Sequence, residues 1–172
     1  MDTAAGFQPL SIVRFTGILH RLANVSPSDF SALWANHAAL AAPWFLYHNV
    51  RGYTQTHATA SAAIPGAKVV DFDGMVELYF DPSTCTLFNP KLLEGRPDSE
   101  GAQKYFEEVI FVDEKRFWDR TEQANVRKGV EWQEGTMGFV GKEVKVIVDG
   151  KVVVDVPDEL WKRWQSYVGG HR

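Results

Sequence analysis

The sequence predicts an α+β protein with one sheet and helices packed against it. Two observations support this class: strand-type and helix-type periodicities alternate through the first two thirds of the chain, and a hairpin signal followed by an amphipathic helix fills the last third. The 172 residues suit one domain, which we place at 1–172, with a core at about 10–125 and a C-terminal extension at 126–172.

The first helix has the clearest start and face. Residues 10–20 precede it and form a predicted strand rich in Ile, Val, Phe and Thr. Ser26 can cap the helix and Pro27 suits its first position, whereas Pro43 is predicted to end the helix or to form part of its exit. Apolar residues and one histidine then recur at steps of three and four, namely Phe30, Leu33, Trp34, His37, Ala38 and Ala41.

Two further strands follow, at 50–58 and 74–81. Alternation in the first of them predicts that its large polar side chains share one face, namely Arg51, Tyr53, Gln55 and His57. In the second strand, Glu77 and Tyr79 lie on the more polar face, opposite Leu78.

The second half of the chain predicts a helix at 98–110, which can continue through "VDEKRFWDRTEQ". Asp149-Gly150 between alternating residues is the strongest hairpin signal in the chain, and a last helix runs from Pro157 to a stop at Gly169. The order β-α-β-β-α-β, with an added strand and helix, indicates a ferredoxin-like α+β sandwich.

Composition excludes several classes of function. The net charge is −4 and no basic run tracks a phosphate backbone, so we expect no nucleic-acid partner. Cys85 is the only cysteine, and neither a signal peptide nor an apolar run of ~18 residues is present, so we expect a cytoplasmic protein without a membrane span. Nucleotide-binding and metal-binding motifs are absent, and we therefore expect neither a cofactor nor a metal.

Four segments in order, "SPSDFSALWANHAAL", "VRGYTQTH", "FDGMVELYFD" and "VDEKRFWD", resemble the EthD-domain family of the dimeric α/β-barrel superfamily. The resemblance implies a ferredoxin-like protomer that pairs sheet to sheet as a homodimer. It also implies a cofactor-free enzyme of an aromatic polyketide pathway, described in such members as a decarboxylase or dehydratase. Relatives in the superfamily include polyketide cyclases and cofactor-independent monooxygenases.

Three residues are candidates for catalysis. His37 lies on an apolar helix face, where a lone histidine is usually part of the core; the family's helix carries a histidine at this place, which favours an acid/base role. His57 would share that work or hold a phenolate, and Tyr53 would donate a hydrogen bond. The alternative for the polar strand face is a solvated surface or a dimer contact.

Substrate-binding candidates surround these three in the sequence. Arg51 could pair with a carboxylate or be structural, and Glu77 could orient a histidine or lie at the surface. The segment after the first helix is expected to be a loop that forms a lid or pocket rim, or that plugs the barrel end. Asp113 could cap a turn, pair with an arginine or relay a proton. The full set is Trp34, Trp44, Phe45, Tyr47, His48, Arg51, Gln55, Glu77, Tyr79 and Asp113.

The sequence thus predicts a cofactor-free lyase, a decarboxylase or dehydratase, acting on an aromatic or pre-aromatic polyketide by histidine and tyrosine acid/base chemistry. The alternatives are a polyketide cyclase or cofactor-independent monooxygenase of the same fold, and a non-catalytic dimeric ligand-binding protein.

Overall fold

The computed structural model describes residues 12–59, 68–69, 72–121, 137–138 and 141–169. Within them, a five-stranded antiparallel sheet has the order β1-β4-β2-β6-β7. Its strands are β1 (Val13–Leu19), β2 (Val50–Ala58), β4 (Gly74–Phe80), β6 (Gly141–Val148) and β7 (Lys151–Val152). Two short strands, β3 (Lys68–Val69) and β5 (Met137–Gly138), pair in parallel apart from this sheet.

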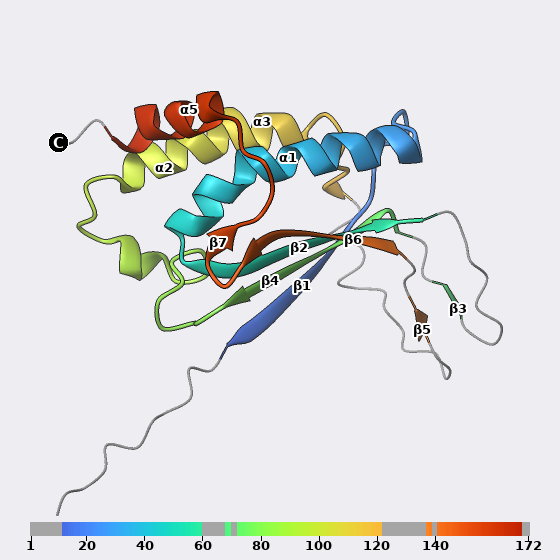
Figure 1. Ribbon diagram of the computed structural model, residues 1–172, viewed down its shortest axis with the longest axis horizontal. Coiled ribbons are helices and arrows are strands. Elements are labelled where there is room, and N and C mark those ends of the chain that lie inside the picture. Colours follow the sequence, from blue (N-terminus) through green and yellow to red (C-terminus); the bar gives the residue numbers. More distant parts are fainter. Residues whose placement is uncertain (1–11, 60–67, 70–71, 122–136, 139–140, 170–172) are drawn as a thin grey trace, which may run out of the picture.

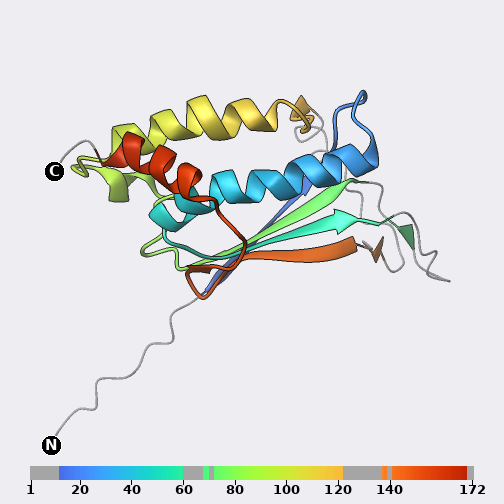
Figure 2. The ribbon, with the colours of Figure 1, turned by 45° about the horizontal axis from the view of Figure 1, so that its top comes forward.

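The α-helices of the described residues cover one face of the sheet, and none of them lies over the other face, which we call the uncovered face (Figures 1 and 2). Helix α1 lies nearest to the sheet. A second rod combines α2, one π-helical turn η2 and α3, and α5 lies beside it. The bounds are α1 (Pro27–Tyr47), α2 (Ser99–Tyr105), η2 (Phe106–Ile110), α3 (Phe111–Glu114) and α5 (Asp158–Val168), with a short 3-10 turn η1 (Pro90–Leu93) before α2. The predicted α+β class is confirmed.

Helix α1 begins as predicted. The Ser26 side chain accepts a hydrogen bond from the Asp29 backbone N–H at 3.1 Å, and Pro27 occupies the first turn. The predicted end at Pro43 is wrong, because Pro43 lies inside the helix, which runs on to Tyr47. Buried packing on both sides of Pro43 outweighs its one lost backbone hydrogen bond.

The longer helix also changes the setting of the aromatic segment that follows Pro43. Trp44, Phe45 and Tyr47 belong to the last turns of α1, and His48 is the C-cap. The expectation that these residues form a loop after the helix is therefore wrong. Trp44 stacks on Phe106 of the second rod, and Phe45 packs against Tyr53 of β2. Tyr47 packs against Trp164 of α5.

A β-bulge alters the faces of β2. The register of β2 against β4 shifts between Val50 and Gly52, so Val50 and Tyr53 are both buried while Arg51 is exposed. One extra residue in a strand moves every side chain before it to the other face. The predicted grouping of Arg51 with Tyr53 on one face is therefore wrong, whereas Tyr53, Gln55 and His57 do share a face.

The predicted helix at 98–110 is confirmed as α2 and η2. Its predicted continuation is wrong beyond Glu114, where α3 ends and a turn begins. Residues 10–11 and 122–123 of the predicted elements lie outside the described residues. The predicted hairpin is also confirmed: Asp149 and Gly150 have φ of 50° and 74°, the left-handed values of a type I′ turn between β6 and β7.

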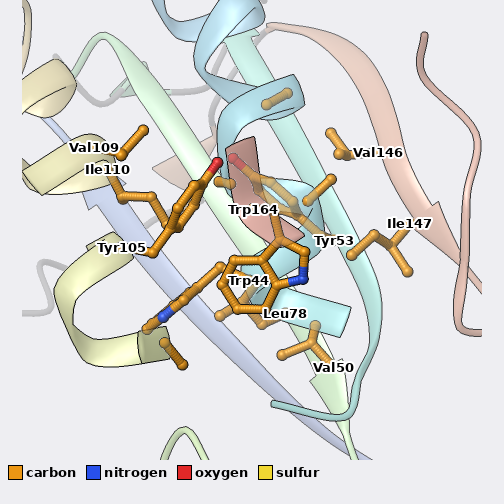
Figure 3. Close-up of a cluster of buried hydrophobic side chains, with 14 of the residues drawn as sticks. Trp44, Val50, Tyr53, Leu78, Tyr105, Val109, Ile110, Val146, Ile147 and Trp164 are labelled. Carbon is orange, nitrogen blue, oxygen red and sulfur yellow. The ribbon is translucent and has the colours of Figure 1, made fainter. Parts of the chain in front are cut away.

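The sequence left open which strand of the C-terminal third joins the main sheet. In the structure this strand is β6, which pairs with β2. The C-terminal third therefore contributes to the main core. Val146 and Ile147 of β6 and Trp164 of α5 are buried there with Tyr53 and Tyr105 (Figure 3). A second buried cluster, Leu19, Phe30, Trp34 and Phe117, lies toward the start of α1.

Candidate active site

A cavity of about 290 Å³ lies between the helices and the covered face of the sheet. Its wall is mainly aromatic and aliphatic, and its polar members are few. Helix α1, the α2–α3 rod and strands β1, β2 and β4 all contribute to it. Phe15 and Phe88 are the most exposed apolar members, at 37% and 48%, and they mark its open side. Concave, mostly apolar sites with a few placed polar groups are typical of ligand binding.

The spacing of α1 explains how one helix supplies so much of this wall. Trp34, His37, Ala41 and Trp44 follow one another at steps of three or four residues, and all line the cavity. The Trp34 ring lies against β4 at Gly74, where an added Cβ would lie 2.4 Å from the ring. Only glycine at position 74 allows the indole to pack so closely on the strand.

His37 lies at the cavity wall between two carboxyl groups. Its Nδ1 is 2.9 Å from Asp113 Oδ2, and its Nε2 is 3.8 Å from Glu114 Oε1. Burial by itself raises the pKa of Asp113, but hydrogen bonds and charge from His37 and Arg116 outweigh it and hold this pKa below its ordinary value. An ionised Asp113 can only accept, so Nδ1 carries a hydrogen and Nε2 is left to exchange a proton on the cavity side.

Glu114 is a cavity residue that the sequence reasoning missed. Burial raises its pKa, against the opposing charges of His37 and Arg120. Its Oε2 is 2.6 Å from Arg120 in an ion pair whose angle is not that of a hydrogen bond. The available signal was its place directly after Asp113 in "VDEKRFWD", but adjacent helix positions point in different directions, and only Asp113 was singled out.

Tyr53 reaches the cavity from β2 at the end of a hydrogen-bonded chain. Ser31 Oγ is 2.9 Å from His57 Nδ1, His57 Nε2 is 2.9 Å from Gln55 Oε1, and Gln55 Nε2 donates to Tyr53 Oη at 2.7 Å and to the Trp34 carbonyl at 2.9 Å. Burial raises the pKa of Tyr53 well above its ordinary value, against hydrogen bonds from Gln55 and Trp34. Tyr53 therefore stays a neutral O–H at physiological pH.

His57 is buried behind Tyr53 and is not part of the cavity wall. Burial, with the charge of Lys142, lowers its pKa to about 4, so the ring is neutral near pH 7. The structure thus places His37 and Tyr53 at the cavity. Hydrogen bonds connect Asp113 to His37, and Gln55 and His57 to Tyr53, from outside the cavity wall.

The other predicted binding residues divide into two groups. Trp34, Trp44 and Phe45 line the cavity. Tyr47 and His48 do not: Tyr47 donates to Asp98 at 3.0 Å, and His48 Nδ1 lies 2.6 Å from Thr86 Oγ1, with its pKa lowered to about 4 by burial and by Arg96.

Arg51, Glu77 and Tyr79 belong to the uncovered face of the sheet. Arg51 and Tyr79 line a wide hollow of about 490 Å³ there, and Glu77 pairs with Arg14 at 3.4 Å. The sheet separates all three from His37 and Tyr53.

Within the described residues, no three His, Cys, Asp or Glu side chains are grouped to hold a metal ion. Asp113 and Glu114 approach opposite nitrogens of the His37 ring, so the three do not converge on one point. In the same part of the chain, no helix combines the length and the apolar character needed to cross a membrane.

Comparison with known protein families finds one match: the EthD domain, over residues 23–121. A search of curated proteins and a search of solved structures found no match. The matched segment covers α1, β2, β4 and the α2–α3 rod, and it includes His37, Tyr53, Asp113 and Glu114. The chain belongs to the EthD-domain family, a family of dimeric α/β barrels with enzymatic members.

Proposed function

We propose that this EthD-domain protein is a cofactor-free lyase that removes CO2 or water from an aromatic or pre-aromatic polyketide. One observation carries the proposal: His37 lies at the wall of a mainly apolar cavity, with Nδ1 held by Asp113 and Nε2 beside Glu114. A histidine oriented by a carboxylate, with its second nitrogen facing a cavity, is suited to move a proton.

In a decarboxylation, the bond to the carboxylate breaks and its electron pair passes to a neighbouring carbonyl, which becomes an enolate. The Tyr53 O–H stabilises that oxygen by a hydrogen bond, since the tyrosine is neutral and its oxygen already accepts from Gln55. The protonated His37 ring then delivers a proton from Nε2 to the carbon. The apolar wall strips water from the carboxylate, which favours loss of CO2.

In a dehydration, the neutral His37 ring takes a proton through Nε2 from the carbon beside a ketone, and Tyr53 again stabilises the enolate oxygen. The hydroxyl then leaves as water with a proton from Glu114, whose raised pKa favours the acid form. Both reactions use His37 and Tyr53, and the dehydration also uses Glu114, so the polar side chains of the cavity support either.

We further propose that the protein is a homodimer whose uncovered sheet faces meet. The family is dimeric, and the helices of the described residues leave one face of the sheet open. That face carries a hollow and exposed apolar residues such as Ile12 and Val148. Light scattering at micromolar concentration should give twice the 19.4 kDa chain mass. A monomer under those conditions would contradict the barrel.

Turnover of aromatic β-keto and ortho-hydroxy acids, and of β-hydroxy ketones, tests the lyase. We expect release of CO2 or a new double bond without oxygen consumption, and activity that survives dialysis against a chelator. The matched variant is Asp113→Asn, which preserves shape but can no longer fix Nδ1–H as a carboxylate does; turnover should fall by roughly 10²–10⁴-fold. Oxygen uptake would indicate a monooxygenase, ring closure without loss of mass a cyclase, and ligand binding without turnover a binding protein; each outcome overturns the proposal.

A further inference from the structure

The wall of the cavity contains one cationic side chain that the proposed chemistry does not use. Among the described residues, Arg120 is the one arginine or lysine that lines this cavity. The sequence had assigned a substrate carboxylate to Arg51, but Arg51 lies at the uncovered face of the sheet. An arginine at the border of an apolar cavity is suited to bind an anionic group of a ligand.

The segment that carries Arg120 is held in place by backbone hydrogen bonds. Directly before Arg120, the Asp119 N–H donates to the His20 carbonyl at 2.8 Å. Two residues earlier, the Phe117 carbonyl accepts from the Leu22 N–H at 2.9 Å. The position of Arg120 at the wall is therefore fixed by the fold, as a binding group must be if it is to select a ligand.

Two aromatic rings contact the guanidinium of Arg120 and leave its hydrogen-bond donors free. The central carbon of the guanidinium lies 4.7 Å from the centre of the Phe111 ring and 4.6 Å from that of Trp118. Within the described residues, its one ion pair is with Glu114, and the angle of that contact is not that of a hydrogen bond. The N–H groups of the planar fork are therefore available to a ligand.

The cation, and not the neighbouring carboxyl group, is the more accessible charge at this wall. Both side chains line the cavity, but 39% of the Arg120 side chain is exposed, against 9% of the Glu114 side chain. The oxygen of Glu114 next to Arg120 is enclosed. Burial also raises the pKa of Glu114, which weakens its negative charge, whereas an arginine stays protonated. This part of the wall therefore favours an anion over a cation.

We infer that Arg120 binds a carboxylate of the ligand at the accessible edge of the cavity, while the aromatic part of the ligand lies inside. The guanidinium fork matches the two oxygens of a carboxylate in parallel hydrogen bonds, which a single phenolate or carbonyl oxygen cannot accept. The inference rests on the proposed function, because it names the group by which the same site selects acids over neutral analogues. Pairing with an arginine stabilises a carboxylate before it reacts, so we assign Arg120 to substrate selection and not to the chemical step.

Three naphthalene derivatives test this inference by binding alone. At pH 7, 2-naphthoate is an anion, 2-naphthamide is neutral with nearly the same shape, and 2-naphthylmethylammonium is a cation. Ligand-observed NMR with the full chain should show 2-naphthoate binding about tenfold more tightly than the amide, and the ammonium no more tightly than the amide. Equal affinities for the acid and the amide, a preference for the ammonium, or binding of none of the three would overturn the inference.

Two arginine variants show whether the preference belongs to Arg120. Arg120→Gln should lower the affinity for 2-naphthoate about tenfold and leave the affinity for the amide within about twofold of the native value. Arg116→Gln is the matched control: it removes the same charge four residues away, from a side chain that is 60% exposed and does not line the cavity. It should keep the preference. An unchanged preference in Arg120→Gln, or an equal loss in both variants, would contradict the assignment.

A second variant covers the case in which Arg120→Gln does not fold. That substitution leaves the buried Glu114 without its ion-pair partner, which is destabilising. If Arg120→Gln fails to melt cooperatively, Arg120→Gln/Glu114→Gln removes both charges, and it should bind the acid and the amide with equal affinity. A preference for the acid that survives in the double variant would overturn the role of Arg120.

The two proposals can fail separately, because 2-naphthoate has no ketone or hydroxyl group beside its carboxylate and is not a substrate of the proposed reaction. A preference for 2-naphthoate that depends on Arg120, in a protein without lyase activity, would refute the reaction and leave the carboxylate site intact. Lyase activity in a protein without that preference would refute the assignment of Arg120 alone.

Discussion

The two buried histidines on the covered face of the sheet, His37 and His57, differ in what their second nitrogen meets. Both are nearly inaccessible, at 5% and 4% exposure. His37 has one nitrogen on Asp113 and the other on the cavity side beside Glu114, whereas both nitrogens of His57 are taken by neutral partners, Ser31 and Gln55. Burial alone therefore does not distinguish the two histidines; they differ in whether the second nitrogen has a hydrogen-bond partner, and this difference is why we propose His37 as the catalytic one.

The two histidines also differ in the charge of their neighbours. The neighbours of His37 are carboxyl groups, which can stabilise an imidazolium during proton transfer. The charged neighbour of His57 is Lys142, which together with burial lowers its pKa to about 4. At neutral pH, His57 has no proton to give beyond the Nε2–H that it donates to Gln55. It can orient Tyr53, but it is poorly suited to be the acid of the reaction.

The largest expected effect is on turnover, and it separates the His37→Asn variant from the His57→Asn variant. Asparagine keeps a hydrogen-bonding side chain of similar size but cannot titrate near neutral pH. His37→Asn should lower turnover by roughly 10²–10⁴-fold, the usual contribution of general acid/base catalysis, whereas His57→Asn should lower it by less than about tenfold. Turnover and thermal melting are measured together for each variant.

Phe30→Leu is the packing control for these variants, because Phe30 is buried on α1 and does not line the cavity. It should lower the melting temperature and leave turnover per folded molecule unchanged. If both histidine variants turned over at the native rate, both rings would be structural, and the distinction drawn here would be wrong.

A smaller effect is expected in acid stability, and it belongs to His57. Its folded pKa of about 4 lies below the value near 6.5 of an unfolded chain, so between these two pH values the unfolded state binds more protons. The free energy of unfolding should therefore fall as pH drops from about 6.5 toward 4, with His57 contributing on the order of 1–3 kcal/mol. The lowered pKa of His48 also makes the free energy of unfolding fall as pH drops. The raised pKa of Glu114 has the opposite effect.

Denaturant unfolding of the native chain and of His57→Asn from pH 7 to 4.5 isolates the His57 contribution as a difference. The variant should lose less stability over this range. If the two curves of unfolding free energy against pH were parallel, His57 would have the same pKa in the folded and unfolded states. Burial of His57 would then not lower its pKa.

Local signals in the sequence were enough to predict much of the fold. The Ser26-Pro27 start of α1, its periodic face and the Asp149-Gly150 hairpin depend on neighbouring residues, and the structure contains all of them. Pro43 was misjudged because tertiary packing, which a local rule ignores, carries the helix past it.

The site was less predictable, because its partners are far apart in the chain. His37 and Asp113 are 76 residues apart, and no periodicity connects them. The bulge before Tyr53 left little trace in the sequence beyond Gly52, yet it moved Arg51 to the opposite face. Glu114 became visible only when the π-turn and α3 were placed against α1.

The smallest expected effect on chemistry is at the uncovered face, where the sequence had placed Arg51, Glu77 and Tyr79 in the substrate site. Glu77→Gln breaks a partly exposed ion pair with Arg14, so stability should change by no more than about 1 kcal/mol. Turnover of Glu77→Gln, Arg51→Gln and Tyr79→Phe should stay within about twofold of the native rate, since the sheet lies between these side chains and His37.

Light scattering on the same three samples separates the two ways in which this expectation could fail. A loss of turnover together with a loss of the dimer would mean that pairing of the sheets supports the cavity from behind. A loss of turnover in an intact dimer would mean that substrate reaches the hollow beside Arg51 and Tyr79, and the chemistry would then belong to the uncovered face of the sheet.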